Sequence, residues 1–235
     1  MQTRDQNKIY PVSEVHVSVC EGVPDYVERN RLAIDENWQQ EVAANPNLYD
    51  GEIYLAPQAR LQDGVLSASY QRTSFRSLLY WRKDERADKP FHIFGSGVIV
   101  SSDNRLLLGQ MAAHNAVGGR IYFPAGSNDD QDIVSGQVDF AGNARREVLE
   151  ETGIDLNDAV HTGGYVVVMS ARSLALFRCY HFDRTGDELQ AQAENYIASQ
   201  IQPELSRILM VVQGGELDER SPAYIHAFTD WYFAQ

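Results

Sequence analysis

The segment between Asp139 and Gly153 restricts the fold of this chain more than any other, because its pattern suits only a helix that packs on a neighbouring layer. Phe140, Ala144 and Val148 recur every four residues, which predicts one apolar helical face. Gly153 is suited to end the helix, and Asp139 is interpreted as its N-cap. We therefore expect a helix of this length that lies on a sheet.

Three carboxylates crowd another side of the same helix. Glu147 precedes Glu150 by three residues and Glu151 by four, so the side chains are helical neighbours. Like charges at this spacing repel one another and raise one another's pKa unless a positive charge lies among them. Hard oxygen ligands in this number favour Mg²⁺ or Mn²⁺ over zinc. The segment predicts a divalent-metal site, with a merely solvated, charge-rich helix as the alternative.

The run from Arg146 to Ile154 resembles the second half of the Nudix box, in which Arg-Glu, an apolar residue, Glu-Glu and Gly-apolar stand at fixed spacing. The resemblance implies an α+β fold, a Nudix αβα sandwich with a mixed sheet, here with an N-terminal α/β extension. It also implies metal-dependent cleavage of the diphosphate in a nucleoside diphosphate linked to another group. The residues that would bind Mg²⁺ or Mn²⁺ are Glu147, Glu150, Glu151 and the carbonyl of Gly126. The same resemblance gives Arg146, Glu147 and Glu150 catalytic roles.

The first half of the box departs from the family's pattern. Its glycine, 14 residues before the arginine, falls on Asp132, and its early glutamate falls on Val138. Gly126, which follows Phe-Pro-Ala, resembles the start of the family's loop but lies 20 residues before Arg146. The loop therefore holds six extra residues. Arg146 needs a partner in place of the missing glutamate, and the candidates are Asp139, Glu150 and a loop carbonyl.

The acidic residues of this loop, Asp129, Asp130 and Asp132, are interpreted as solvated, with metal ligation as the alternative. The catalytic base in this family is often a glutamate outside the box. Glu204, just before a predicted strand at Ser206, is the preferred candidate, although it is equally typical of a surface glutamate. The other candidates are Glu188, Glu194 and Glu216.

Three N-terminal segments resemble a branch of the Nudix family that has a lengthened, irregular box and includes a vertebrate UDP-glucose and UDP-galactose diphosphatase. The segments are Ala33–Trp38, Asn45–Gly51 and Ser69–Arg76. The resemblance implies hydrolysis of a UDP-sugar to UMP and a sugar 1-phosphate. The alternatives are ADP-ribose or another nucleotide sugar as substrate, and a non-catalytic Nudix-fold module that only binds nucleotides.

Positive and aromatic side chains near the loop and in the N-terminal part are the candidates for contacting this substrate. Arg120 and Tyr122 stand just before the loop, and Arg72 and Arg76 belong to the N-terminal part. Arginines bind phosphate oxygens in a forked geometry, but surface arginines and a core tyrosine fit the same pattern. We therefore expect a small-molecule nucleoside diphosphate as the partner.

Residues 82–90 are strongly charged and mark a candidate boundary between an N-terminal extension, 1–89, and a Nudix domain, 90–235; a solvated loop within one domain is the alternative. Elsewhere the patterns predict further strands, and one helix over each of the ranges 25–44, 74–81, 188–200 and 223–233. Members of the family often form homodimers, so we consider that assembly for this chain.

The overall charge of the chain, −13, argues against nucleic acid or an anionic membrane as partner. The first six residues carry no apolar core of signal-peptide type, and no run approaches the ~20 apolar residues of a membrane span. Cys20 and Cys179 are interpreted as buried free thiols. A soluble, cytoplasmic protein is the expectation.

Overall fold

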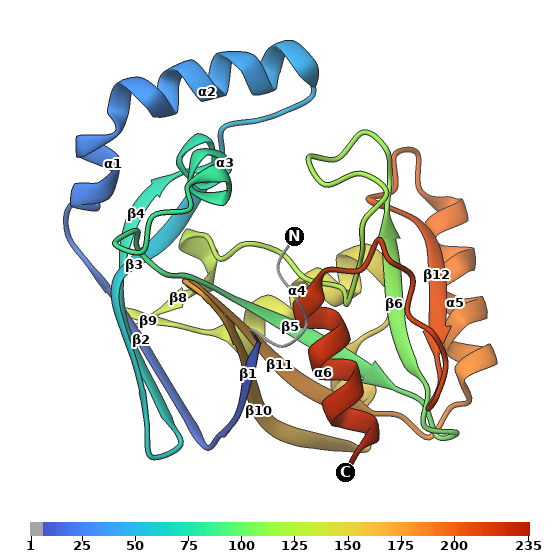
Figure 1. Ribbon diagram of the computed structural model, residues 1–235. Helices are drawn as coiled ribbons and strands as arrows, with labels where there is room; N and C mark the ends of the chain where they lie inside the picture. Colours follow the sequence, from blue (N-terminus) through green and yellow to red (C-terminus); the bar gives the residue numbers. More distant parts are fainter. Residues whose placement is uncertain (1–6) are drawn as a thin grey trace.

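The computed structural model describes residues 7–235, which form two mixed β-sheets with helices on their faces (Figure 1). The prediction for residues 1–6 lies outside the described residues. In the larger sheet the strand order is β1, β10, β11, β5, β6, β12, and β7 pairs with β6. Only β11 and β5 are parallel neighbours. The strands are β1 (Lys8–Val12), β5 (His92–Val100), β6 (Leu106–Met111), β7 (Ile121–Tyr122), β10 (His161–Ser170), β11 (Ser173–His181) and β12 (Leu205–Val211).

Helices cover both faces of the larger sheet (Figure 1). On strand β5, Val98 faces the core that contains Phe228 of α6 (Ala223–Phe233). The next residue, Ile99, faces a second core that contains Val148 of α4 (Phe140–Thr152) and Leu189 of α5 (Gly186–Ser199). Because successive strand residues point to opposite faces, these cores lie on the two sides of one sheet. The predicted α+β class and αβα layering are confirmed.

The smaller sheet has the strand order β3, β4, β2, β9, β8, of which β2 and β4 are parallel. Its last two strands belong to the loop before α4, so this sheet unites the N-terminal part with that loop. The N-terminal part also carries three helices, as the predicted α/β extension requires. The elements are β2 (Glu14–Cys20), β3 (Glu52–Gln62), β4 (Val65–Ser74), β8 (Ile133–Val134), β9 (Gln137–Val138), α1 (Asp25–Arg29), α2 (Arg31–Ala44) and α3 (Phe75–Lys83).

One local prediction is wrong in part, and it concerns the helix of the N-terminal part. The turn between β3 and β4 lies at Asp63 and Gly64, which have positive φ angles of 50° and 77°. The predicted single helix over 25–44 is two helices that meet at Asn30. The Asn30 side-chain amide donates to the carbonyl of Tyr26 at 2.6 Å, which competes with continuous helical bonding.

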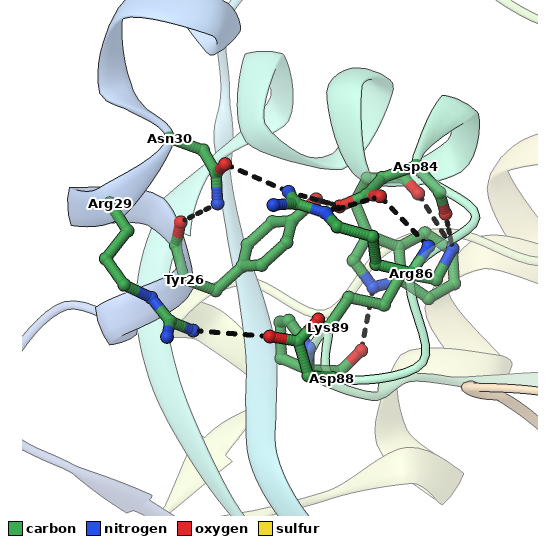
Figure 2. A network of polar contacts seen from close by, with 9 residues as sticks. Tyr26, Arg29, Asn30, Asp84, Arg86, Asp88 and Lys89 are labelled. Atoms are coloured by element: carbon green, nitrogen blue, oxygen red, sulfur yellow. Dashed lines mark hydrogen bonds and ion pairs between the residues drawn. The ribbon is translucent and has the colours of Figure 1, made fainter.

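The charged segment after α3 is fastened to α1 by a polar network (Figure 2). Tyr26 donates from its hydroxyl to Asp84 at 2.7 Å, and Arg86 donates to Asn30 at 2.9 Å and to Asp84. Lys89 donates to the carbonyl of Trp81 at 2.9 Å. This network orders the chain between α3 and β5. The division of the chain at residue 89 stays a prediction.

Both cysteines are free, as predicted, but Cys20 is exposed and Cys179 only partly buried. Cys20 stands at the end of β2, where it lines a surface cavity instead of the core. Within residues 7–235, no helix is long and apolar enough to cross a membrane.

Candidate active site

Helix α4 lies close against the larger sheet and carries the three predicted metal ligands. Asp139 caps it by accepting a hydrogen bond from the Gly142 amide at 2.9 Å, and Gly153 ends it with a φ of 66°. A Cβ on Gly142 would lie 2.5 Å from the Asp139 carboxylate, so the cap requires glycine there. A Cβ on Gly97 of β5 would lie 3.0 Å from Val148, so glycine also lets the helix approach the sheet.

The three glutamates of α4 differ in burial. The side chain of Glu147 is 13% exposed and that of Glu150 is 58% exposed, whereas Glu151 is buried. Burial raises the pKa of Glu147 to about 7, with repulsion from Glu150 and Glu204 adding to the effect and Arg146 opposing it. Burial also raises the pKa of Glu151 well above its usual range, and the charges of Glu147 and Glu204 raise it further. The site therefore concentrates more negative charge than it balances.

The backbone of the loop before α4 touches these carboxylates. The Ala125 amide donates to Glu151 at 3.2 Å. A Cβ on Gly126 would lie 2.0 Å from the carboxyl carbon of Glu147, so any other residue at this position would displace the glutamate side chain. Gly126 therefore allows the loop backbone and the glutamate to meet, as its predicted place beside the metal ligands requires.

Arg146 is held by three carboxylates. It contacts Glu147 at 2.7 Å, Glu150 at 3.5 Å and Asp132 at 3.2 Å. Of the predicted partners, Glu150 is confirmed, whereas Asp139 is the helix cap. Asp132 was not among the predicted partners. The sequence did contain a signal for this contact: the Nudix-like segment lacks the early glutamate that the family's arginine needs, and Asp132 is an acidic residue in the same loop.

The prediction of a solvated acidic loop is wrong for Asp132. Its side chain is only 4% exposed, and besides Arg146 it accepts hydrogen bonds from the Asn143 side chain at 2.9 Å and the Asp129 amide at 3.0 Å. Asp130 is exposed but accepts hydrogen bonds from Tyr54 of β3 and Arg72 of β4. The extra loop residues thus tie the N-terminal sheet to the arginine of α4.

A cavity of about 680 Å³ opens beside the carboxylates and brings several predicted residues together. Its walls include Gly126 and Glu151 at one side, Glu204 from the turn before β12, and Arg120 and Tyr122 from β7 and the residue before it. The other predicted ligands, Glu147 and Glu150, lie next to this wall on α4. Carboxylates and nucleotide-contacting candidates therefore share one cavity.

Among the four candidates for a base, Glu204 is the one that lines this cavity within the described residues. Its backbone carbonyl accepts hydrogen bonds from Ala112 and Asn115, each at 2.8 Å, which fixes its position while the side chain stays exposed. The other three have different places: Glu188 caps α5, Glu194 bonds to Gln190 on the same helix, and Glu216 lines a separate surface hollow.

Arg72 and Arg76 do not join this cavity. Both line a different one, of about 800 Å³, between the smaller sheet and the N-terminal helices. Arg72 pairs with Glu52 at 3.0 Å, and Arg76 pairs with Asp50 at 2.6 Å. The structure therefore places these arginines, together with their carboxylate partners, away from Glu151.

The donor atoms of the site suit a hard divalent cation, because the carboxylates of α4 lie against the backbone of the loop at Ala125 and Gly126. Within residues 7–235, however, no three His, Cys, Asp or Glu side chains are arranged ready to hold a metal. Glu147 is directed to Arg146 at 2.7 Å instead. A cation would have to compete with Arg146 for this carboxylate.

No protein-family model and no curated protein matches the sequence. Solved structures with partial similarity include a bifunctional NMN adenylyltransferase/ADP ribose pyrophosphatase from Francisella tularensis, complexed with AMP and a Mn ion. Its TM-score is 0.42 at 14% identity, over 66% of this chain and 44% of that one, so this chain spans less than half its length. A MutT protein from Methanosarcina mazei Go1 has a TM-score of 0.40 at 20% identity, over 63% and 95%. A Nudix hydrolase from Nitrosomonas europaea has a TM-score of 0.39 at 15% identity, over 61% of this chain and 90% of that one.

Proposed function

We propose that this chain is a divalent-metal-dependent Nudix hydrolase that cleaves the diphosphate bridge of a nucleoside diphosphate linked to another group. The observation that carries the proposal is the contact between the carboxylates of α4 and the loop backbone at Gly126. The Nudix-like run from Arg146 to Ile154 supplies these carboxylates, and a nucleotide-sized cavity opens beside them. A pure binding module has no need for a crowded, repulsive carboxylate site.

Glu147, Glu150, Glu151 and the Gly126 carbonyl would hold Mg²⁺ or Mn²⁺. The bound cation would neutralise diphosphate charge and lower the pKa of a water molecule. Glu204 accepts a proton from the attacking water, because its carboxylate is exposed in the cavity beside Glu151. Arg146 orients Glu147 through their 2.7 Å contact, and Asp132 holds Arg146 from the other side.

A UDP-sugar is the substrate that we favour, with UMP and a sugar 1-phosphate as products. Support comes from the N-terminal segments that resemble the UDP-sugar branch of the family. Arg120 and Tyr122 lie in the cavity and would contact the nucleotide. Arg72 and Arg76 act from outside it, by fastening the loop and the N-terminal helices through Asp130 and Asp50.

The test is product analysis of purified protein incubated with UDP-glucose or ADP-ribose, each with and without Mg²⁺. We expect UMP to form only with the metal, and faster than AMP. Glu151→Gln should lose activity by at least about 100-fold, because it removes a charged ligand at nearly constant volume. Its thermal unfolding should stay near that of the wild type, since the buried carboxylate is a source of repulsion.

The surface variant Glu194→Gln is the matched control, because Glu194 bonds only to Gln190 of its own helix. It should keep full activity. If AMP forms from ADP-ribose faster than UMP forms from UDP-glucose, the chain is a hydrolase but the UDP-sugar assignment is wrong. An active Glu151→Gln enzyme would remove the metal site as placed here.

A further inference from the structure

One end of the cavity is lined by aromatic rings from three elements. Tyr122 of β7 and Tyr224 of α6 are roughly parallel, with ring centroids 6.4 Å apart. Phe94 of β5 packs edge-on against Tyr224 at 5.6 Å and stacks on His92 at 5.1 Å. All four residues line the cavity. Such a surface suits a planar, heteroaromatic group.

Arg82, the next-to-last residue of α3, lies at this aromatic end. Arg82 is exposed to solvent at one side, while desolvation by its surroundings lowers its pKa, and Tyr122 and Tyr224 oppose this effect. Arg82 in turn contributes to the low pKa of His92, which burial chiefly brings to about 3. Arg82, His92 and the two tyrosines line the same cavity.

The guanidinium of Arg82 has no polar partner within residues 7–235: its one recorded contact is with the ring of Phe75, at 5.9 Å. Several other arginines pair with carboxylates, as Arg86 does with Asp84 and Arg220 with Asp218. The carboxylate that acts on Arg82 most, Glu41, is itself paired with Lys83. The five donor hydrogens of Arg82 therefore have no acceptor among the described residues.

We propose that Arg82 reads the nucleobase, by donating hydrogen bonds to the carbonyl oxygens of an oxo-pyrimidine such as uracil that lies against Tyr122 and Tyr224. The proposal rests on the proposed function, because it takes the diphosphate to be at the glutamate end of the cavity. Arg82 then belongs to the N-terminal part of the chain and determines specificity at a site whose catalytic groups lie on α4.

The chemistry of the two common bases explains the preference. A guanidinium only donates hydrogen bonds, so it needs acceptors. Uracil presents two carbonyl oxygens, whereas adenine presents an amino group whose hydrogens meet the guanidinium unfavourably. Because Arg82 is exposed, water takes the place of the base on its donors, and a ligand without matching acceptors loses only the hydrogen bonds that it cannot make. Arg82 should therefore favour UMP over AMP.

The test measures binding of UMP and of AMP by calorimetry, without metal, so that it does not depend on turnover. We expect the wild type to bind UMP more tightly. Arg82→Met should weaken the binding of UMP by about tenfold or more, which is the usual effect of losing a charged hydrogen bond. Its affinity for AMP should stay within about twofold of the wild type. Arg82→Lys keeps the charge but not the planar fork, and should also lose much of the preference. Arg207→Met, an exposed arginine of β12 outside the cavity, should change neither affinity.

Three results would overturn the proposal. They are a wild type that does not bind UMP more tightly than AMP, an Arg82→Met variant that loses affinity equally for UMP and AMP, and an Arg82→Met variant that loses affinity for neither. An equal loss of affinity would mean that Arg82 binds the phosphate, which UMP and AMP share. Hydrolysis of UDP-glucose and ADP-glucose, which differ only in the base, separates the two proposals. If neither is cleaved while UMP binding depends on Arg82, the proposed function fails and base recognition stands. If wild type and Arg82→Met each cleave UDP-glucose and ADP-glucose at the same rate, the hydrolase proposal stands and base recognition by Arg82 fails.

Discussion

The position of Glu147 depends on a single arginine that shares its charge among several carboxylates. Arg146 is 28% exposed and contacts Glu147, Glu150 and Asp132. Asp132 is the most buried of the three, and its other oxygen contacts come from Asn143 and the Asp129 amide. The orientation of Glu147 is therefore set partly from outside its own helix.

Replacing Asp132 with asparagine should weaken both stability and turnover. The shape is kept, but Arg146 loses its buried counter-charge, which we expect to lower the free energy of unfolding by about 1–3 kcal/mol. Turnover should fall mainly in kcat, because Arg146 would then act on Glu147 and Glu150 alone. Chemical denaturation and steady-state kinetics measure the two effects.

Asp130→Asn is the matched control for this change, because Asp130 stands in the same short turn but is exposed and pairs with Arg72. We expect a smaller loss of stability and no selective loss of kcat. Equal effects of the two substitutions on kcat would contradict the positioning role of Asp132.

At the scale of elements, the sequence predicts α4 closely, because its determinants are local. The cap at Asp139, the apolar spacing and Gly153 all lie within the helix or next to it. The partner of Arg146 was not predictable in the same way. Asp132 reaches it because η2 (Asp130–Asp132), β8 and β9 fold onto the N-terminal sheet, and Tyr54 and Arg72 fasten that turn from a distant part of the chain.

The segment after α3 offers a test of stability at this scale (Figure 2). Hydrogen bonds from Arg86, with help from Tyr26, hold the pKa of Asp84 well below its usual range. A depressed carboxyl pKa stabilises the folded state above the unfolded pKa of about 4, and this contribution is lost as pH falls from there through the folded pKa. Asp84→Asn should thus lower the Tm at pH 7 by about 3 °C, with a smaller difference at pH 3.

Thermal unfolding at the two pH values measures this effect. Asp88→Asn is the control, since Asp88 is exposed and its contact with Arg29 is long, at 3.9 Å. It should leave the Tm unchanged at both pH values. A deficit of Asp84→Asn that is as large at pH 3 as at pH 7 would contradict the assignment to charge.

At the scale of the whole molecule, the sequence predicts the class of fold and the sites of most elements, but not how the two sheets share segments. Strand β1 joins the larger sheet beside β10, and the loop before α4 completes the smaller one. Arg72 and Arg76 show the consequence: sequence proximity to the N-terminal motifs does not reveal which cavity they line. Arg82 lay within a stretch that was interpreted only as charged, because only the fold brings it to the same cavity as Tyr122 of β7 and Tyr224 of α6.

The excess of negative charge at the site should make the whole molecule respond to metal and pH together. Burial raises the pKa of Glu147 from 4.5 to about 7, and it also raises the pKa of Glu151 well above its usual range. The folded state therefore retains protons that the unfolded state releases, so the free energy of unfolding falls as pH rises from about 4.5 to 7, by about 3 kcal/mol for Glu147. In the absence of metal, the Tm should decline over this range.

Mg²⁺ or Mn²⁺ should raise the Tm more at pH 8 than at pH 5.5, because at the lower pH a cation must first displace protons from the same carboxylates. Thermal unfolding with added metal, and after its removal by EDTA, measures this difference. Glu151→Gln should show a weaker metal response and a flatter pH dependence, while Glu194→Gln should behave as the wild type. An equal gain in Tm at both pH values would mean that the cation binds elsewhere, because only groups that exchange protons for metal couple the two.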